Sequence, residues 1–194
     1  MKIKELVFAS GNAHKIEEIE AILGGEMKLI GLPEVGIDGD LEESAATLEG
    51  NAQQKARFVF SQTGRNCFAD DTGLEVQALN GAPGVYSARY AGEMRDNALN
   101  RKKLLQELTG KSDRSARFRT VFCLLFEGQE YLFEGIVTGA ILSEERGSGG
   151  FGYDALFCPE GESRSFAEMS SLEKNQLSHR GRAAIRLAEF LRAM

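Results

Sequence analysis

The sequence predicts an α/β fold: a mixed, twisted sheet flanked by helices, with two lobes around a central cleft and a long antiparallel β arm. Three observations support this prediction. Strand-like apolar runs alternate with segments of helical spacing through the first half of the chain. Two β-rich runs, 115–127 and 130–142, flank Glu127-Gly128-Gln129-Glu130 and indicate a long hairpin. With 194 residues and 42% hydrophobic content, the chain can bury one core, so we expect a single domain over residues 1–194.

The chain begins with a strand, a loop and a helix. Leu6–Ala9 is apolar throughout, and after the loop Ile16, Ile19, Ile22 and Leu23 recur at helical spacing. Peptide N–H groups at such a helix start can hold an anion, and Lys15 in the first turn can reach a phosphate. The spacing of a P-loop is absent. An ordinary helix cap is the alternative role for Ser10 or Asn12.

A second strand, an acidic loop and a second helix follow. Met27–Leu32 is the predicted strand, and residues 33–47 form a polar loop that contains Glu42 and Glu43. Residues 48–62 predict a helix that ends before Gly64. Lys55 falls near the buried edge of this helix, where it either faces a ligand or extends its ammonium group to solvent.

The segment 67–90 carries the densest set of polar and turn-forming residues. It predicts two short strands, 67–69 and 74–79, separated by Asp70-Asp71-Thr72-Gly73. Adjacent carboxylates repel unless water, a cation or a proton separates them, so the pair suits a magnesium site. An Asp-rich turn with Gly is the alternative. Residues 80–84 form a second tight connection, which favours a site over a simple hairpin.

The second half of the chain contains four further signals. Asp96 is the expected cap of a helix that runs to about Leu108. Residues 147–152 match the dinucleotide pattern G-x-G-x-x-G, but 153–157 predicts a strand where that pattern needs a helix, so a dinucleotide site is disfavoured. Residues 170–173 form a capping box before a short helix. Residues 177–181 are expected to interrupt this short helix before a last helix follows.

Composition excludes several classes of function. The net charge of −6 argues against a general nucleic-acid surface. No apolar run is long enough to span a bilayer and the start does not resemble a signal peptide, so we expect a cytoplasmic protein with no membrane partner. The three cysteines, Cys67, Cys123 and Cys158, are expected to be buried thiols. Two histidines exclude a His-based metal cluster.

Five motifs together resemble the inosine/xanthosine triphosphate pyrophosphatase family, which hydrolyses non-standard purine nucleoside triphosphates. In chain order they read S-G-N-A-H-K at 10–15, G-N-A-Q-Q-K-A at 50–56, the segment around D-D-T-G at 70–73, F-G-Y-D at 151–154 and S-H-R at 178–180. Ala155 stands where this family usually has proline, and Thr72 where it often has serine. The order and number of the motifs make the resemblance specific over nearly the whole chain.

The resemblance implies an ITPase-like fold and hydrolysis of ITP, dITP or XTP to the monophosphate and pyrophosphate, with Mg²⁺ as cofactor. It implies that Asp71 ligates the metal and accepts the proton of the attacking water. It also implies a glutamate of the acidic loop as a further metal ligand, with Glu43 as the first candidate and Glu42 as the second. Asp70 stays an open candidate for the metal. His179 and Arg180 are implied to read the purine base, and the enzyme is expected to be a homodimer.

The substrate-binding residues that follow from the loop at 10–15 and from the resemblance are Ser10, Gly11, Asn12, Ala13, His14, Lys15, Lys55, Thr72, Phe151, Gly152, Tyr153, Asp154, Lys174, His179 and Arg180. Two other functions remain open. One is a nucleotide sensor without turnover, which the added carboxylates disfavour because they would repel a polyanion unless a metal intervened. The other is a related pyrophosphatase for modified pyrimidine or methylated nucleotides.

Overall fold

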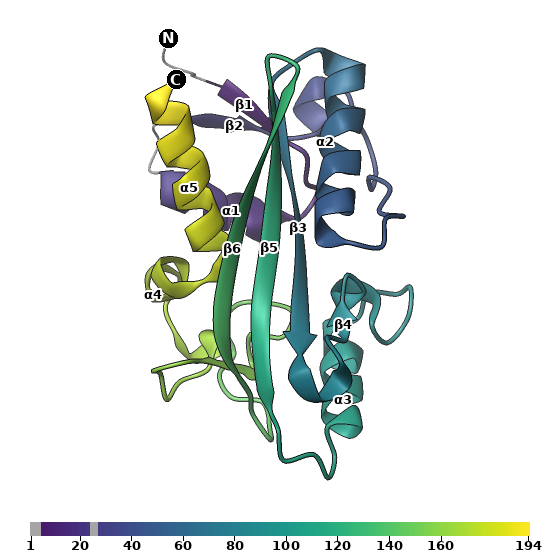
Figure 1. Ribbon diagram of the computed structural model, residues 1–194, viewed down its shortest axis with the longest axis vertical. Coiled ribbons are helices and arrows are strands. Elements are labelled where there is room, and N and C mark those ends of the chain that lie inside the picture. Colours follow the sequence, from purple (N-terminus) through teal and green to yellow (C-terminus); the bar gives the residue numbers. More distant parts are fainter. Residues whose placement is uncertain (1–4, 24–26) are drawn as a thin grey trace. The chain divides into compact units, whose positions relative to one another are not determined.

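The computed structural model describes residues 5–23 and 27–194, and these residues divide into two compact units (Figure 1). The first unit contains the chain up to Asp71 together with Thr120–Gly135 and Arg180–Met194, and the second contains Thr72–Arg119 and Ile136–His179. Each unit is therefore assembled from distant parts of the sequence. The strands β3 (Cys67–Val76), β5 (Ser115–Phe126) and β6 (Gln129–Ile141) contribute residues to both units.

The first unit is built on parallel strands. The strand β1 (Glu5–Phe8) pairs in parallel with β2 (Lys28–Ile30) on one side and with the start of β3 on the other, and the strand order continues to β5 and β6. Parallel neighbours need crossover connections. The helix α1 (Ala13–Leu23) joins β1 to β2, and α2 (Leu48–Thr63) lies between β2 and β3 in the chain.

The helix α2 has the ends that the sequence predicts. The Thr47 hydroxyl accepts a hydrogen bond from the Gly50 N–H at 3.0 Å, which caps the amino terminus. Gly64 follows the last turn with φ of 63°, a left-handed conformation that glycine adopts without steric cost. Local interactions at Thr47 and Gly64 therefore determine where the helix begins and where it ends.

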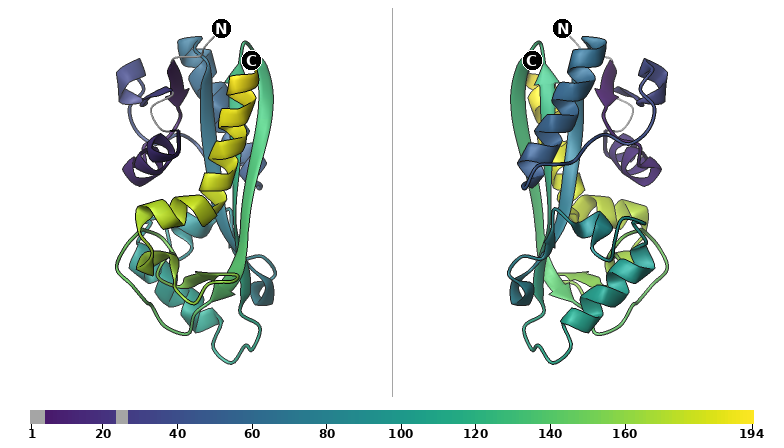
Figure 2. Two further views of the ribbon diagram at one scale, coloured as in Figure 1. Left: turned by 90° about the vertical axis from the view of Figure 1, so that its left-hand side faces the viewer. Right: turned by 90° about the vertical axis from the view of Figure 1, so that its right-hand side faces the viewer.

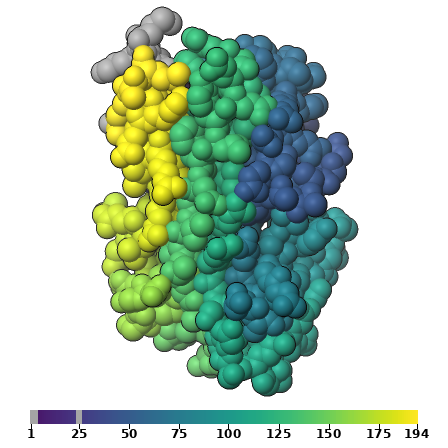
Figure 3. All heavy atoms as spheres, in the orientation of Figure 1, coloured from purple at the N-terminus to yellow at the C-terminus, as the bar shows by residue number. Residues whose placement is uncertain are grey.

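Aromatic stacking holds the core of the first unit. Phe8 on β1 stacks on Phe68 on β3 with ring centroids 4.4 Å apart, and α1 and α5 (His179–Ala193) cover this layer. Figures 1 and 2 show α5 alongside β6, where Tyr131 and Phe190 pack with centroids 4.5 Å apart. In Figure 3 the side chains of α5, in yellow, lie directly against those of the β5–β6 hairpin, in green. Apolar burial of this kind is the main stabilising contribution.

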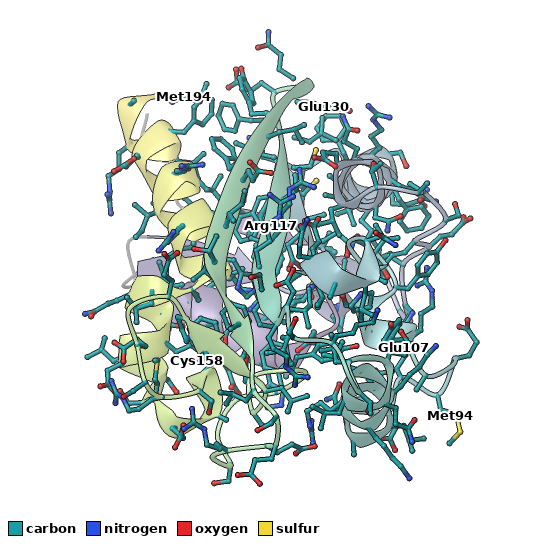
Figure 4. All side chains as sticks on the ribbon, turned by 60° about the horizontal axis from the view of Figure 1, so that its bottom comes forward. Met94, Glu107, Arg117, Glu130, Cys158 and Met194 are labelled. Carbon is teal, nitrogen blue, oxygen red and sulfur yellow. The ribbon has the colours of Figure 1, made fainter. Side chains whose placement is uncertain are left out.

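The second unit is antiparallel. The short strand β4 (Pro83–Gly84) pairs with the end of β3, and β7 (Phe157–Pro159) pairs with β6. Arg117 on β5, which Figure 4 labels, forms an ion pair of 2.6 Å with Glu75 on β3. The helices α3 (Asn97–Glu107) and α4 (Ser171–Leu177) complete the second unit. The core of this unit contains Leu74, Leu104, Phe118, Phe157 and Phe166. Short 3₁₀ turns occupy 33–35 in the first unit and 77–79, 87–89 and 166–168 in the second.

The prediction of two strands within 67–79 was wrong. Residues 67–76 form one continuous strand, and 77–79 form a 3₁₀ turn. Aspartate and glycine are poor strand formers and therefore suggested a turn at 70–73. Tertiary contacts overrode that local preference, because both aspartates are compensated by side chains from other elements of the first unit.

Two further boundaries differ from the prediction. Residues 153–156 form turns, and the strand begins only at Phe157. The Asp154 carboxylate accepts a hydrogen bond from the Phe151 N–H at 2.8 Å, which favours a turn at this point. Near the end of the chain, only Ser178 separates α4 from α5, so His179 and Arg180 open the last helix and do not interrupt it.

The fold class is confirmed as a mixed α/β sheet with flanking helices, and the hairpin, the Asp96 cap and the capping box occur as expected. The single domain stays a prediction, since the described residues form two compact units. All three cysteines are free thiols, with Cys67 and Cys123 buried and Cys158 partly so. Among the described helices, none has the length and apolar character that crossing a membrane would require.

Candidate active site

The strand β3 sends its two adjacent aspartates to opposite faces of the sheet in the first unit. Successive side chains on a strand alternate between faces. Phe68 and Asp70 share the face that α1 and α5 cover, whereas Cys67, whose thiol donates to the Ala56 carbonyl of α2, shares the other face with Asp71. The pleat therefore separates two carboxylates that a turn would have left crowded together.

Asp70 meets cations from two helices. Its Oδ2 atom lies 2.7 Å from the Lys15 ammonium nitrogen of α1 and 3.9 Å from Nε of Arg180 of α5. Arg180 also donates from its guanidinium to the Glu18 carboxylate. Asp70 is fully buried, and Arg180 is only 2% exposed. Such buried charges are tolerated because each one has a partner of opposite sign.

Electrostatics on this face favour the ionised carboxylate. Burial alone would raise the pKa of Asp70, but Lys15, Arg180 and Lys55 outweigh it and lower that pKa to about 2. Burial also lowers the pKa of Lys15, and Asp70 only partly offsets this effect. Each of the two side chains therefore favours the charged form of the other.

Lys15 lies in the first turn of α1, next to an exposed polar loop. The Asn12 side chain accepts a hydrogen bond from the Lys15 N–H at 3.3 Å, and the Ser10 hydroxyl accepts one from the Asn12 N–H at 3.2 Å. Gly11, Ala13 and His14 are exposed around this turn. The predicted helix cap is therefore present, and it directly precedes Lys15, whose ammonium group contacts Asp70.

Asp71 faces α2. Its Oδ2 atom accepts a hydrogen bond of 2.9 Å from the Asn51 side chain, and its Oδ1 atom lies 4.0 Å from the Lys55 ammonium nitrogen. The same ammonium donates to the Glu43 carboxylate. One cation therefore contacts two carboxylates, one from β3 and one from the acidic loop. Glu42, next to Glu43, is exposed.

The two groups of this second face have shifted pKa values. Burial raises the pKa of Asp71, and the opposing effects of Lys55 and Lys15 do not cancel it. Burial would lower the pKa of Lys55, but Asp71, Asp70 and Glu43 together raise it. Lys55 consequently stays protonated and neutralises part of the negative charge. Among residues 5–23 and 27–194, no group of three or more His, Cys, Asp and Glu side chains is arranged to hold a metal ion.

In the second unit, the F-G-Y-D segment folds around Asp154. The buried Asp154 carboxylate accepts hydrogen bonds from the Phe151 N–H at 2.8 Å and from the Lys174 ammonium at 2.7 Å. The Lys174 nitrogen also lies 4.8 Å from the Phe151 ring centroid, a cation–π contact. A Cβ at Gly150 would lie 2.1 Å from Asp154 Oδ2. Glycine is therefore required for this close approach.

Other predicted residues of the second unit have defined places. The Gly152 carbonyl accepts a hydrogen bond from Arg101, and the Tyr153 hydroxyl donates to the Ser87 carbonyl at 2.8 Å. The His179 ring is buried and stacks on Phe118, with centroids 4.7 Å apart. Thr72 is half-buried on β3. Phe151 is half-buried, whereas Tyr153 is only 4% exposed, so the Phe151 ring is the more accessible of the two for stacking.

The structure reveals two polar residues that the sequence interpretation missed, Asn51 and Glu18. Asn51 precedes Lys55 by four residues, and Glu18 follows Lys15 by three. Residues at these spacings share one face of a helix. That periodicity could have suggested both of them as neighbours of the lysines.

Replacing Asp70 with Asn is expected to destabilise the metal-free protein at pH 7, because the partly buried Lys15 and the buried Arg180 then lose an opposite charge. The pKa of Asp70 falls from 3.8 to about 2 on folding, so its ionised form stabilises the fold above the unfolded pKa, and this contribution is lost as the pH falls toward 2. The shift corresponds to about 2 kcal/mol. Urea unfolding in EDTA should give a stability gap between wild type and variant that narrows below about pH 4.

The exposed Asp38 supplies the matched control, since Asp38→Asn should show no such gap at any pH. A constant difference between wild type and Asp70→Asn from pH 7 to pH 3 would contradict the assigned ion pairs.

Comparisons with known proteins identify the family of this chain. The Ham1 family model matches residues 6–190. The chain is 52% identical to the dITP/XTP pyrophosphatase of Porphyromonas gingivalis over 190 residues, which covers 97% of this chain and 98% of that protein. It is 49% identical to the dITP/XTP pyrophosphatase of Flavobacterium psychrophilum over 188 residues, which covers 97% and 99%.

Solved structures lead to the same family. The HAM1 protein from Coxiella burnetii superposes with a TM-score of 0.91 at 39% identity, and the match covers 99% of this chain and 100% of that one. The resemblance that the five sequence motifs predict is therefore confirmed by the family model, by full-length relatives and by shared structure. The chain belongs to the Ham1 family.

Proposed function

We propose that this protein hydrolyses non-standard purine nucleoside triphosphates, namely ITP, dITP and XTP, to the monophosphate and pyrophosphate. One observation carries the proposal: neighbouring carboxylates on β3 face different lysines, Asp70 toward Lys15 and Asp71 toward Lys55. This arrangement supplies two cations for a polyphosphate and one acidic group for a metal and a water molecule. The names of the relatives from Porphyromonas and Flavobacterium support the substrate class.

We propose Mg²⁺ as the cofactor, with Asp71 and Glu43 as its protein ligands. Mg²⁺ usually takes only one or two carboxylates and completes its octahedron with waters and substrate phosphate oxygens. The residues fit this need, because the Lys55 ammonium already contacts both carboxylates and shows that a single cation can interact with the two. When bound, Mg²⁺ would neutralise charge that develops on the transferring phosphoryl group.

The cationic side chains would hold the triphosphate. Lys15 lies in the first turn of α1 next to the exposed residues 11–14, and Lys55 stands beside Asp71. Lys174, from the second unit, is proposed as a further contact. Fixed cations of this kind stabilise negative charge in the transition state without having to reorganise during the reaction.

Asp71 would act on the attacking water. The water oxygen attacks phosphorus at the α–β anhydride, its proton passes to an Asp71 oxygen, and pyrophosphate leaves with the electron pair of the broken P–O bond. Asp70 has a different place in this scheme, since its contacts with Lys15 and Arg180 commit it to holding cations. The two aspartates would thus divide catalysis and positioning between them.

Recognition of the base is proposed for His179, Arg180 and the F-G-Y-D segment, with Phe151 as the stacking ring. Arg180 is held in a defined orientation by Glu18 and Asp70. We also propose that the enzyme is a homodimer, which the family resemblance implies, and that it is cytoplasmic. The net charge of −6 supports the further proposal that no nucleic acid binds.

Asp71→Asn is expected to lower kcat by 10²–10⁴-fold, on the order of losing a catalytic acid–base group, because it removes a metal charge and the proton acceptor while keeping the shape of the side chain. Pyrophosphate and orthophosphate should be quantified separately with ITP at saturating Mg²⁺. Near wild-type turnover by the Asp71→Asn variant would exclude the role assigned to Asp71.

The wild-type protein tests the alternative functions in the same assay. An inactive wild-type protein that still binds the nucleotide would favour a sensor, and better turnover of modified pyrimidine or methylated nucleotides would favour the related pyrophosphatase.

The neighbouring glutamates allow a matched test of the metal site. Glu43→Gln should weaken the activation of ITP hydrolysis by Mg²⁺ by on the order of 10-fold or more, because Glu43 contacts the same ammonium as Asp71. Glu42→Gln should leave the Mg²⁺ titration unchanged, because Glu42 is exposed. The reverse pattern would assign the loop ligand to Glu42.

Base discrimination provides a separate prediction. A pocket that donates hydrogen bonds to a 6-keto oxygen should favour ITP and XTP over ATP by up to about 10⁴-fold, because the 6-amino group of adenine leaves buried donors unpaired. Discrimination against GTP should be weaker, since guanine shares the 6-keto group. Arg180→Ala should lower kcat/KM for ITP strongly and that for ATP little. An equal loss of kcat/KM for ITP and ATP would show that Arg180 only supports the Asp70 cluster and does not read the base.

A further inference from the structure

Three neighbouring residues of the acidic loop are each bound by one face of α2. The Glu43 carboxylate contacts Lys55, the Ala45 N–H donates to Asn51 Oδ1 at 2.9 Å, and Ser44 bonds to Gln54 through its N–H at 3.2 Å. Asn51, Gln54 and Lys55 follow the i, i+3, i+4 spacing that places side chains on a common helix face. The loop is thus aligned along this face one residue at a time.

Asn51 differs from the other two because it also contacts β3. Its side-chain N–H donates to Asp71 Oδ2 at 2.9 Å, and its side chain is almost fully buried at 1% exposure. The orientation of the amide is determined by its partners, since the Ala45 N–H can only donate and the Asp71 carboxylate can only accept. One side chain therefore connects the loop next to Glu43 with the carboxylate of Asp71.

The backbone of α2 is adapted to this contact. A Cβ at Gly50 would lie 2.6 Å from the Ala45 Cβ, closer than side chains ever approach. The glycine directly before Asn51 therefore lets Ala45 come close enough for its N–H to reach the amide. The Asn51 N–H itself donates to the Thr47 carbonyl in the first turn of the helix, so Asn51 is held at both backbone and side chain.

We propose that Asn51 is a positioning residue that orients the Asp71 carboxylate and, through Ala45, sets the place of Glu43 beside it. The bond to Oδ2 restricts rotation of the carboxylate and directs Oδ1 toward Lys55. This inference rests on the proposed function, in which Asp71 and Glu43 share a metal ion. Outer-shell partners of ligating carboxylates typically change metal affinity or activity by about 10–100-fold when they are removed.

The test uses Asn51→Ala in the full-length protein, with two readouts. Mn²⁺ binding to the substrate-free protein, followed by electron paramagnetic resonance, should weaken by about 10–100-fold, and kcat for ITP should fall by a similar factor with a smaller change in KM. Gln53→Ala is the matched control, because this amide on the same helix bonds instead to the distant Glu130 and should change neither value. Asn51→Ser serves the same purpose if the alanine variant does not fold.

A double-mutant cycle separates positioning from a general structural role. If Asn51 acts through Asp71, Asn51→Ala should add little to the loss already caused by Asp71→Asn. Gln54→Ala, which loosens Ser44 without touching Asp71, should cost less than Asn51→Ala. Equal further losses in both backgrounds, or unchanged kcat and Mn²⁺ affinity in a folded Asn51 variant, would overturn the inference. Inactivity of the wild type would instead overturn the proposed function, and the Mn²⁺ comparison would still test Asn51.

Discussion

The site of the first unit depends on one geometric constraint, the alternation of side chains along β3. Two aspartates in sequence would repel each other strongly in a low-dielectric interior. Within a strand they point to opposite faces, and each face supplies its own compensation: Lys15 and Arg180 for Asp70, and Lys55 with Asn51 for Asp71. The crossover connections between the parallel strands provide α1 and α2, which carry Lys15, Asn51 and Lys55, and the last helix α5 provides Arg180.

This arrangement gives two identical side chains different chemistry. Asp70 is surrounded by cations that keep it ionised, whereas burial raises the pKa of Asp71 despite the nearby lysines. A buried ion pair adds little net stability relative to an apolar core, because desolvation offsets much of the Coulomb attraction. The cluster around Asp70 is therefore better explained as a means of holding Lys15 and Arg180 in place than as a device for stability. The same reasoning applies to Asp154, which orders Phe151 and Lys174 in the second unit.

Local sequence signals predicted most of the helices and strands, but not the side chains, distant in the sequence, that compensate the buried charges of β3. The caps at Asp96 and Ser170 and the glycine at position 64 are short-range signals, and they predicted these helix ends correctly. The continuous strand through Asp70 was missed, because its stability comes from side chains on α1, α2 and α5 that no local pattern connects to it. The five motifs identified the family, and the roles of Asn51 and Glu18 became visible only with the contacts that they make.

The central claim is that Asp71, and not Asp70, belongs to the metal site. A crystal structure with Mg²⁺ and a non-hydrolysable α,β-imido analogue of ITP tests it most directly. The account predicts Mg²⁺ bound to Asp71 and Glu43, with Asp70 still paired to Lys15 and Arg180. A metal ion coordinated by Asp70, with the Lys15 ion pair broken, would contradict it.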